Sequence, residues 1–317
     1  MPESTSADVP LPMRVVSLAP AVTRMIVDLG VADVLVGVGE HDDAAPAGLR
    51  VVGNFMNIHT EALVNVRPTH VVAMYGSGAV PPQLVRLART HQFELSVYAY
   101  PNRIDQVMRI LYRDDDASGT DQTSTSRSLA RLVGAPVAGR RLRDRMLAQL
   151  DSIADLTRTR PAPSVLMVIA TGPVMASGPG TVLDDMLCRY AGARNAAAAA
   201  AMTVLTCDRE KLLRLRPDVI LLLRPGDPPL GRLEDDPRLA DLRGLDIPAV
   251  QQRRIALISD PLTLLPATSL PRIVGAMVAS IHRDLREPID SILDSRTDAT
   301  AHDRLEPVTD RAPAPTP

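Results

Sequence analysis

The histidines are the residues of this sequence best suited to bind a metal or move a proton, and their spacing argues against an enzyme. They stand at positions 41, 59, 70, 91, 282 and 302. No two of them form an HExxH or HxH pattern, so the spacing that holds a catalytic zinc ion is missing. The GxSxG turn of a serine hydrolase is missing too, as is the GxGxxG or P-loop spacing that cradles a nucleotide phosphate. We therefore expect neither an enzyme nor an intrinsic cofactor.

The two cysteines point the same way. Cys188 and Cys207 are too few for a disulfide scaffold and lack the paired spacing of a zinc site. Free cysteines are usually buried, and we expect these two to be buried thiols.

Composition excludes several classes of partner. The net charge is -2, so no overall basic field exists to hold a nucleic acid. Aromatic residues make up 2% of the chain and Trp is absent, which predicts a ligand pocket that is mainly aliphatic and polar. No run approaches eighteen apolar residues, so we expect no insertion into a membrane. The start of the chain shows no basic segment followed by an apolar run, and therefore no visible signal peptide.

An internal repeat indicates two related halves. The segment LVNVRPTHVVAMYGSG at 63–78 aligns without a gap with LLRLRPDVILLLRPGD at 212–227, a constant offset of 149 residues. Glu61 and Glu210 correspond at the same offset. Each copy predicts a short helix (60–65 and 208–214) that stops at an X-Pro pair, followed by a strand (70–74 and 219–223). Both strands are apolar at successive residues, which is typical of a parallel strand covered on both faces.

The remaining elements extend this pattern to two α/β lobes. Further strands are predicted at 14–18, 34–38, 95–98, 164–169 and 254–258. Between the halves, residues 137–159 carry apolar side chains at a spacing near 3.6 and predict a helix about 30 Å long. We expect a tail at 1–12, a first lobe at 13–128, a connecting helix at 129–160, a second lobe at 161–295 and a tail at 296–317. The polar stretch 114–128 should be a loop. The expected fold is α/β: two small parallel-sheet lobes, one long rigid helix and a ligand cleft between the lobes.

Five segments in order bring a family into view. RVVSLAPAVTRMIVDLGVADVLVGV, GNFMNIHTEALVNVRPTHVVA, SGPGTVLDDMLCRYAGARN, CDREKLLRLRPDVILL and ISDPLTLLPATSLPRIVGAM span about residues 14–285. Together they resemble the periplasmic substrate-binding proteins of vitamin B12, siderophore and haem importers, which have two α/β lobes joined by one long helix. The resemblance implies a monomer that binds cobalamin, a ferric siderophore or haem for an ABC-type importer.

The resemblance also implies a docking surface for the permease dimer. In that family a glutamate on each lobe contacts basic residues of the permease, and the matching positions here are Glu61 and Glu210. Taken singly, each is better explained as a solvated carboxylate near a helix N-terminus, where the helix dipole favours an anion. Their equivalence across the repeat favours docking.

Topology places the candidate ligand site. Ligands bind beyond the carboxyl ends of parallel strands, so the loops after the predicted strands should line the cleft. The candidate ligand-binding residues on these loops are Pro20, His41, Phe55, Asn57, Tyr75, Tyr100, Gly172, Arg224 and Asp260. His41 is a candidate ligand for iron or cobalt or an exposed loop residue. Phe55, Tyr75 and Tyr100 either contact the ligand or pack in the lobe, and Arg224 either pairs with an anionic ligand group or stays on the surface.

One alternative function stays open. The same scaffold can store, sense or carry a corrinoid or metal chelate in the cytosol without a transporter, and the missing signal peptide agrees with that. Family resemblance favours a periplasmic location.

Overall fold

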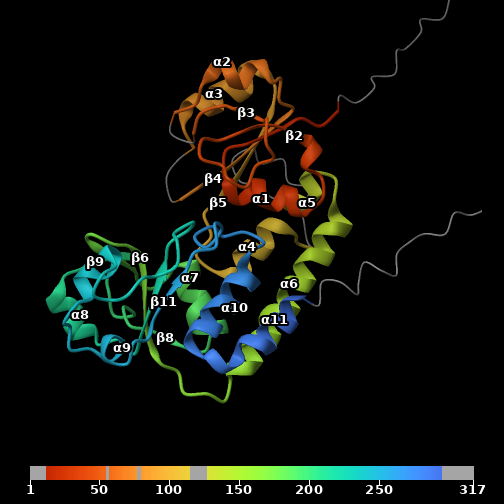
Figure 1. Ribbon diagram of the computed structural model, residues 1–317. Coiled ribbons are helices and arrows are strands. Elements are labelled where there is room, and N and C mark those ends of the chain that lie inside the picture. The colour runs from red at the N-terminus through yellow and green to blue at the C-terminus, as the bar shows by residue number, and fades with distance from the viewer. Residues whose placement is uncertain (1–11, 55–56, 77–79, 115–126, 295–317) are drawn as a thin grey trace, which may run out of the picture.

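The chain folds into two lobes joined by a long helix (Figure 1). The computed structural model describes residues 12–54, 57–76, 80–114 and 127–294. Nearly all of the two predicted tails, and most of the predicted loop 114–128, lie outside the described residues.

The first lobe is built on a parallel sheet of five strands in the order β3-β2-β1-β4-β5. Its elements are β1 (Val15–Ser17), α1 (Pro20–Asp28), a 3-10 turn (Ala32–Val34), β2 (Leu35–Val38), β3 (Arg50–Val51), α2 (Thr60–Asn65), β4 (His70–Tyr75), α3 (Pro82–His91), β5 (Glu94–Ala99) and α4 (Ile104–Leu111). The strands predicted from the sequence are present within one or two residues of their expected ends.

The second lobe has a mixed sheet. Strands β11, β10, β6 and β8 pair in parallel, whereas β7 pairs antiparallel with both β6 and β9. The elements are β6 (Ser164–Ala170), β7 (Val174–Ser177), α7 (Val182–Asp185), a π-helical turn (Met186–Tyr190), β8 (Arg194–Asn195), β9 (Val204–Cys207), α8 (Arg209–Leu215), β10 (Val219–Leu223), a 3-10 turn (Pro237–Leu242), α9 (Pro248–Gln251), β11 (Ile255–Ile258), α10 (Leu270–Ile281), a 3-10 turn (Arg283–Leu285) and α11 (Arg286–Asp294). The two-lobed α/β fold is therefore confirmed, with a correction: the second sheet is not purely parallel.

The internal repeat is visible in the backbone. Helix α2 and strand β4 start 149 residues before α8 and β10. In both copies the arginine before proline has a positive φ, 44° at Arg67 and 42° at Arg216. The same helix–turn–strand unit thus ends its helix in the same way in each lobe.

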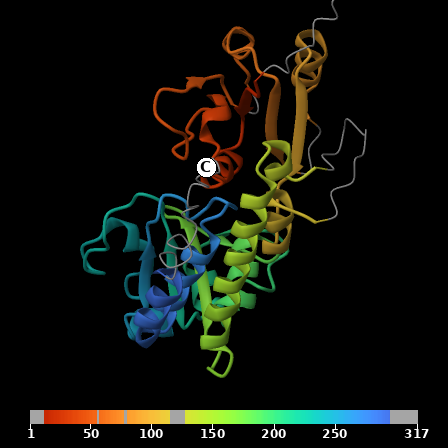
Figure 2. The same ribbon diagram turned by 90° about the vertical axis from the view of Figure 1, so that its right-hand side faces the viewer.

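The lobes are connected by α5 (Leu129–Leu132) and the 22-residue α6 (Pro136–Thr157). Figure 2 shows α6, in yellow-green, running from the first lobe along the side of the second. The predicted segment 129–160 contains both helices, so the long helix itself is shorter than that segment. At 1.5 Å per residue α6 is about 33 Å long. Among the described helices, none combines the length and apolar character needed to cross a membrane.

One hydrophobic core continues from lobe to lobe along α6. It includes Val22 and Leu111 of the first lobe, Ile153 of α6, and Val165 and Val274 of the second lobe. The outer face of each sheet has a separate core, which lies under α2 and α3 in the first lobe and under α8 and α9 in the second. The lobes therefore share buried apolar surface and are not independent bodies on a flexible linker.

Candidate functional site

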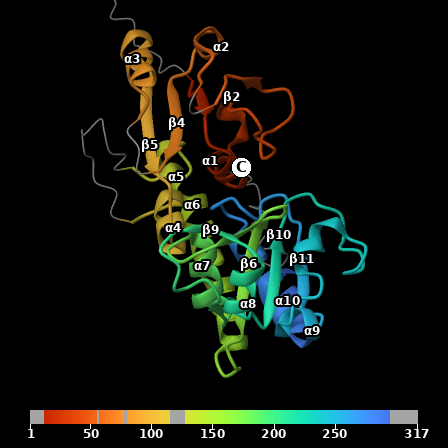
Figure 3. The ribbon, with the colours of Figure 1, turned by 90° about the vertical axis from the view of Figure 1, so that its left-hand side faces the viewer.

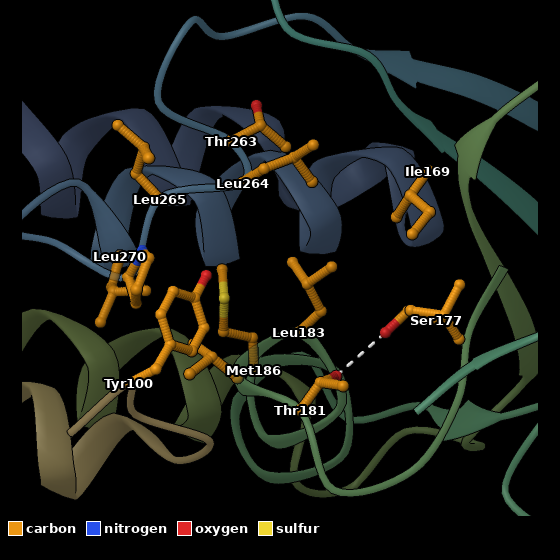
Figure 4. Close-up of a pocket in the computed structure, with 13 residues that line it drawn as sticks. Tyr100, Ile169, Ser177, Thr181, Leu183, Met186, Thr263, Leu264, Leu265 and Leu270 are labelled. Atoms are coloured by element: carbon orange, nitrogen blue, oxygen red, sulfur yellow. Dashed lines mark hydrogen bonds between the residues drawn. The ribbon is translucent and has the colours of Figure 1, made fainter. Parts of the chain in front are cut away.

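A pocket of about 160 Å³ lies where the first lobe meets the second (Figure 4). We call it the interlobe pocket; it is lined by Tyr100, Ile169, Ser177, Thr181, Val182, Leu183, Met186, Val204, Thr263, Leu264, Leu265, Pro266 and Leu270. Tyr100 comes from the first lobe and the other residues come from the second.

The walls of the interlobe pocket come from the cleft-facing ends of several elements. Ile169 is near the end of β6, while Ser177 and Val204 pair across β7 and β9. Helix α7 begins beside them, and its N-cap residue Thr181 accepts a hydrogen bond from the backbone N–H of Asp184 (3.1 Å). The loop 263–266 before α10 forms the opposite wall. The pocket is thus assembled mainly from residues that follow or precede strands of the mixed sheet.

Tyr100 reaches this pocket because of its place after β5. Its backbone N–H donates to the Tyr75 carbonyl oxygen (2.6 Å), which extends the pairing of β5 with β4 by one residue. The residue remains 54% exposed, and Figure 4 shows its ring beside Met186 with the hydroxyl directed toward the loop 263–265. Burial by the surrounding side chains raises the pKa of the Tyr100 hydroxyl above its usual value. The phenol is therefore neutral at physiological pH.

A hydrogen bond between the lobes fixes the two walls relative to each other. The backbone N–H of Ile104, at the start of α4, donates to Oδ2 of Asp185 in α7 (2.8 Å). Ile104 is four residues after Tyr100, and Asp185 immediately precedes Met186. Figure 3 shows α4 next to α7 at the junction of the lobes. Asp185 is thus a positioning residue for the pocket.

The structure places Tyr75 away from this pocket. Tyr75 is 9% exposed and belongs, with Val71 and Ala73, to the core on the outer face of the first sheet. Burial raises the pKa of its hydroxyl to about 12. Its predicted contact with a ligand finds no support in this placement, because alternate residues of a strand point to opposite faces.

Two predicted charged residues have partners within the second lobe. Arg224 Nε donates to Oδ2 of Asp227 (3.1 Å). Asp260 pairs with Arg272 (2.7 Å) and accepts the backbone N–H of Leu262 (2.9 Å). Asp260 lies on a second hollow, between β11, α10 and α11, and not on the interlobe pocket.

The remaining predicted residues lie on loops or turns. Pro20 is the first residue of α1, and Gly172 (φ 63°) is in the turn that joins β6 to β7. Asn57 is exposed, and its backbone N–H donates to the Asn54 side chain (2.8 Å). Phe55 lies outside the described residues. Pro20, Asn57 and Gly172 are not among the residues that line the interlobe pocket.

His41 is held on a turn after β2. It is exposed and has a φ of 57°, which is uncommon for a residue other than glycine. Its neighbour Asp42 accepts a hydrogen bond from the buried Thr23 hydroxyl (2.5 Å). Burial raises the pKa of Asp42, although the hydrogen bonds from Thr23 and the Ala44 backbone act against that shift. Within the described part of the chain, no three His, Cys, Asp or Glu side chains are grouped to hold a metal ion.

The predicted docking glutamates occupy equivalent positions. Glu61 is exposed in the first turn of α2, and Glu210 is exposed in the first turn of α8. Glu210 accepts from Arg214 one helical turn later (2.6 Å), an exposed pair worth little to stability.

Comparison with known proteins decides the family. The model of the periplasmic binding protein family matches residues 15–262. This chain belongs to that family. Membership confirms the resemblance inferred from the five sequence segments, and with it the prediction of a binding protein in place of an enzyme.

Similar proteins are named for the binding of vitamin B12 or haem. A vitamin B12-binding protein of Photorhabdus laumondii subsp. laumondii is 24% identical over 214 residues, covering 67% of this chain and 70% of the relative. The apo form of the periplasmic haem-binding protein RhuT of Roseiflexus sp. RS-1 is 24% identical, with 86% of this chain and 98% of that chain covered and a TM-score of 0.65. The haem-binding protein BhuT, solved with two haems, is 25% identical, with 87% and 98% covered and a TM-score of 0.65. The names of these proteins state that they bind vitamin B12 or haem.

Sequence reasoning missed most of the interlobe pocket. It found Tyr100. It did not find Ser177, the residues Thr181, Val182, Leu183 and Met186 around α7, or Val204, and it predicted neither β7 nor β9. The available signal was Thr181, a typical N-cap residue directly after the glycine-rich SGPG at 177–180.

Proposed function

We propose that this protein is the extracytoplasmic substrate-binding component of an ABC-type importer and that it captures a haem or a corrinoid between its lobes. The observation that carries the proposal is the interlobe pocket, which combines a first-lobe tyrosine with an apolar second-lobe wall in a chain of the periplasmic binding protein family. The B12-binding and haem-binding relatives support this class of cargo. Delivery then requires a permease, with Glu61 and Glu210 as its proposed contacts.

Titration with candidate ligands tests the proposal. The purified protein is titrated with cyanocobalamin, haemin and a ferric siderophore, and binding is followed by the visible spectrum of each ligand. We expect saturable binding of haemin or cyanocobalamin at a fixed molar ratio of ligand to protein. Binding of the siderophore should be at least tenfold weaker. Failure of both macrocycles to bind would remove the proposed function.

A matched pair of variants locates the binding site. Leu264→Asp places a charge on the wall of the interlobe pocket, where an unpaired carboxylate against an apolar ligand is costly. Val137→Asp places the same charge on the exposed surface of α6, where Val137 is 64% exposed and is not among the residues that line the pocket. Only the first change should weaken binding, by tenfold or more. Equal effects of the two changes would show that binding occurs elsewhere.

Location is a separate part of the proposal. We expect the protein in the periplasmic or other extracytoplasmic fraction of its native cells, detected with an antibody. Recovery with the cytosolic markers alone would instead support a cytosolic corrinoid or metal-chelate binder.

A further inference from the structure

Among the described residues, those that line the interlobe pocket include no charged residue and no histidine. Of its thirteen residues, most are aliphatic. Three carry aliphatic hydroxyls, and all three are engaged within the protein. Ser177 and Thr181 hydrogen-bond to each other (2.9 Å), and the Thr263 hydroxyl donates to the Asp260 carbonyl oxygen (2.7 Å). These groups therefore have little capacity left for a polar or anionic ligand.

The Tyr100 hydroxyl is the remaining polar group of the lining. In the described residues no group hydrogen-bonds to it, so it is available to a ligand. A phenol coordinates a metal ion as phenolate, which requires loss of its proton. No lining residue is a cation that would stabilise a phenolate, and burial raises the pKa of this hydroxyl. Tyr100 is thus arranged as a neutral contact surface and hydrogen-bond donor.

Two exposed apolar side chains border the pocket from opposite lobes. Tyr100 is 54% exposed and Leu264 is 37% exposed, in a chain whose other large apolar residues are mostly buried. Figure 4 shows them on opposite walls, with Met186 beside the tyrosine ring. Because both side chains line the same pocket, they present apolar surface to a ligand from the two lobes. That surface suits an uncharged edge inserted between the lobes.

We propose that the interlobe pocket recognises the apolar rim of a tetrapyrrole macrocycle and leaves the metal without a protein ligand, so that a metal-free macrocycle binds as tightly as its metal complex. This rests on the proposed function and deepens it. Charged substituents of the macrocycle stay at the mouth, because burying an unpaired carboxylate among apolar side chains is strongly unfavourable. Affinity then comes from apolar contact with both lobes.

Paired titrations with protoporphyrin IX and haemin test this inference. These ligands share the same ring and substituents and differ in the iron. We expect their dissociation constants for the wild-type protein to agree within threefold. Tyr100→Ala should weaken both by tenfold or more, because it removes the first-lobe wall. Tyr100→Phe keeps the ring and should weaken both equally, by less than threefold.

A preference of more than tenfold for haemin over protoporphyrin IX would overturn the inference. If Tyr100→Phe abolishes that preference and shifts the visible band of bound haemin, Tyr100 is an iron ligand. If His41→Ala abolishes it instead, the imidazole is the ligand. Far-ultraviolet circular dichroism of each variant verifies folding, and Val137→Ala serves as the control for loss of an exposed apolar side chain outside the pocket.

The outcomes also separate this inference from the proposed function. If haemin or cyanocobalamin binds and protoporphyrin IX does not, the inference fails while the proposed function stands. If none of the three binds, the proposed function itself fails.

Discussion

At the scale of residues, the two candidate tyrosines differ in the face of the sheet to which their side chains point. Tyr98 of β5 points into the core shared by the lobes, and Tyr100, two residues later, continues on that side into the pocket. The Tyr75 side chain points to the opposite face, into the core on the outer side of the first sheet. Because β4 is apolar on both faces, its sequence does not alternate between apolar and polar residues. It therefore does not show to which face of the sheet Tyr75 points. Loop position was therefore predictable, and side-chain direction was not.

The charged candidate residues illustrate a second limit of prediction from the sequence. Arg224 and Asp260 are on loops that the sequence placed correctly, yet their partners Asp227 and Arg272 are three and twelve residues away. Several acidic and basic residues lie at such distances in any loop. Only the folded geometry selects the pair, and a paired side chain has less to offer a ligand.

Asp236 should give the second lobe a measurable dependence on acid. It is 6% exposed, and the Arg238 guanidinium, with the backbone N–H groups of Gly231 and Arg238, holds its pKa well below the usual range. A lowered pKa in the folded state stabilises the fold above the unfolded value near 3.9, and this contribution is lost as the pH falls below it. Asp236→Asn should lower the free energy of unfolding at pH 7 by about 2–3 kcal/mol, the usual worth of hydrogen bonds to a charged group.

Urea unfolding of wild type and Asp236→Asn at pH 7 and at pH 3 measures this effect. The difference between the two proteins should shrink at pH 3, where unfolded Asp236 is protonated. An equal difference at both pH values would show that the carboxylate charge contributes nothing. Asp235→Asn, an exposed neighbour, provides the control and should change stability by less than about 0.5 kcal/mol.

At the scale of elements, the sequence predicted the longer parallel strands and missed the two-residue parallel strands β3 and β8 and the short strands β7 and β9, which pair antiparallel. Strands 219–223 and 70–74 were recognised as continuous apolar runs, and β10 and β4 follow them closely. Strands β7 and β9 have four residues each and follow a short turn and an alanine-rich stretch. Such segments carry too little periodicity to be recognised. Because Ser177 ends β7 and Val204 begins β9, the missed strands account for two of the missed pocket residues.

The contact between α5 and α6 should not tolerate a methyl group at Gly139. A Cβ built there would lie 2.2 Å from Cβ of Ala130. Alanine gains about 1 kcal/mol over glycine in a helix interior, whereas overpacking costs about 1–3 kcal/mol. The clash between two helices has no flexible side chain to relieve it, so we expect Gly139→Ala to destabilise the protein by up to about 2 kcal/mol.

Thermal unfolding of Gly139→Ala and of the double variant Ala130→Gly/Gly139→Ala tests the contact. The second change removes the atom that the new methyl group meets, so the double variant should be more stable than the sum of the two single changes implies. A melting temperature of Gly139→Ala above that of the wild type would contradict the predicted clash.

The hydrogen bond between α4 and α7 should affect binding more than folding. Asp185→Ala removes the acceptor of the Ile104 N–H and leaves the interlobe pocket with walls that are less well fixed. We expect ligand affinity to fall about threefold to tenfold while the melting temperature falls by a few degrees. Asp144→Ala, an exposed carboxylate on α6, is the matched control. Unchanged affinity in Asp185→Ala would show that α4 needs no such anchor.

At the scale of the whole molecule, the connections between the lobes restrict their movement. The shared core continues along α6, and at a second point the Thr268 hydroxyl of the second lobe donates to Asp28 of α1. Asp28 is also held by Arg24 (2.8 Å). Bending α6 sharply would break backbone hydrogen bonds in a helix that has no internal proline. The repeat and the long helix were readable from the sequence, but the contact between Asp28 and Thr268, 240 residues apart, was not.

The lobes should therefore move little on binding. Small-angle X-ray scattering of the protein with and without saturating ligand should give radii of gyration that agree within about 1 Å, because no hinge of the kind that permits domain closure is present in the described connection. A contraction of several ångströms would contradict this expectation. Thr268→Val removes the contact with Asp28, and any larger movement in that variant would identify this contact as a restraint.

The two docking glutamates belong to the molecule as a whole, because their proposed role requires both lobes. A carboxylate needed only for its own helix has no reason to recur at the same point of both halves of the repeat. Changing Glu61 and Glu210 together to Lys should abolish uptake by cells or proteoliposomes that contain the cognate permease, since like charges then meet at both contacts. Ligand affinity and melting temperature should stay nearly unchanged, because exposed substitutions usually alter stability by less than about 0.5 kcal/mol.

Glu287→Lys reverses an exposed carboxylate in the first turn of α11, outside the repeat, and should transport normally. Full uptake by the double variant would leave the two glutamates as ordinary surface residues, and loss of uptake in Glu287→Lys as well would show a general effect of charge in place of two specific contacts.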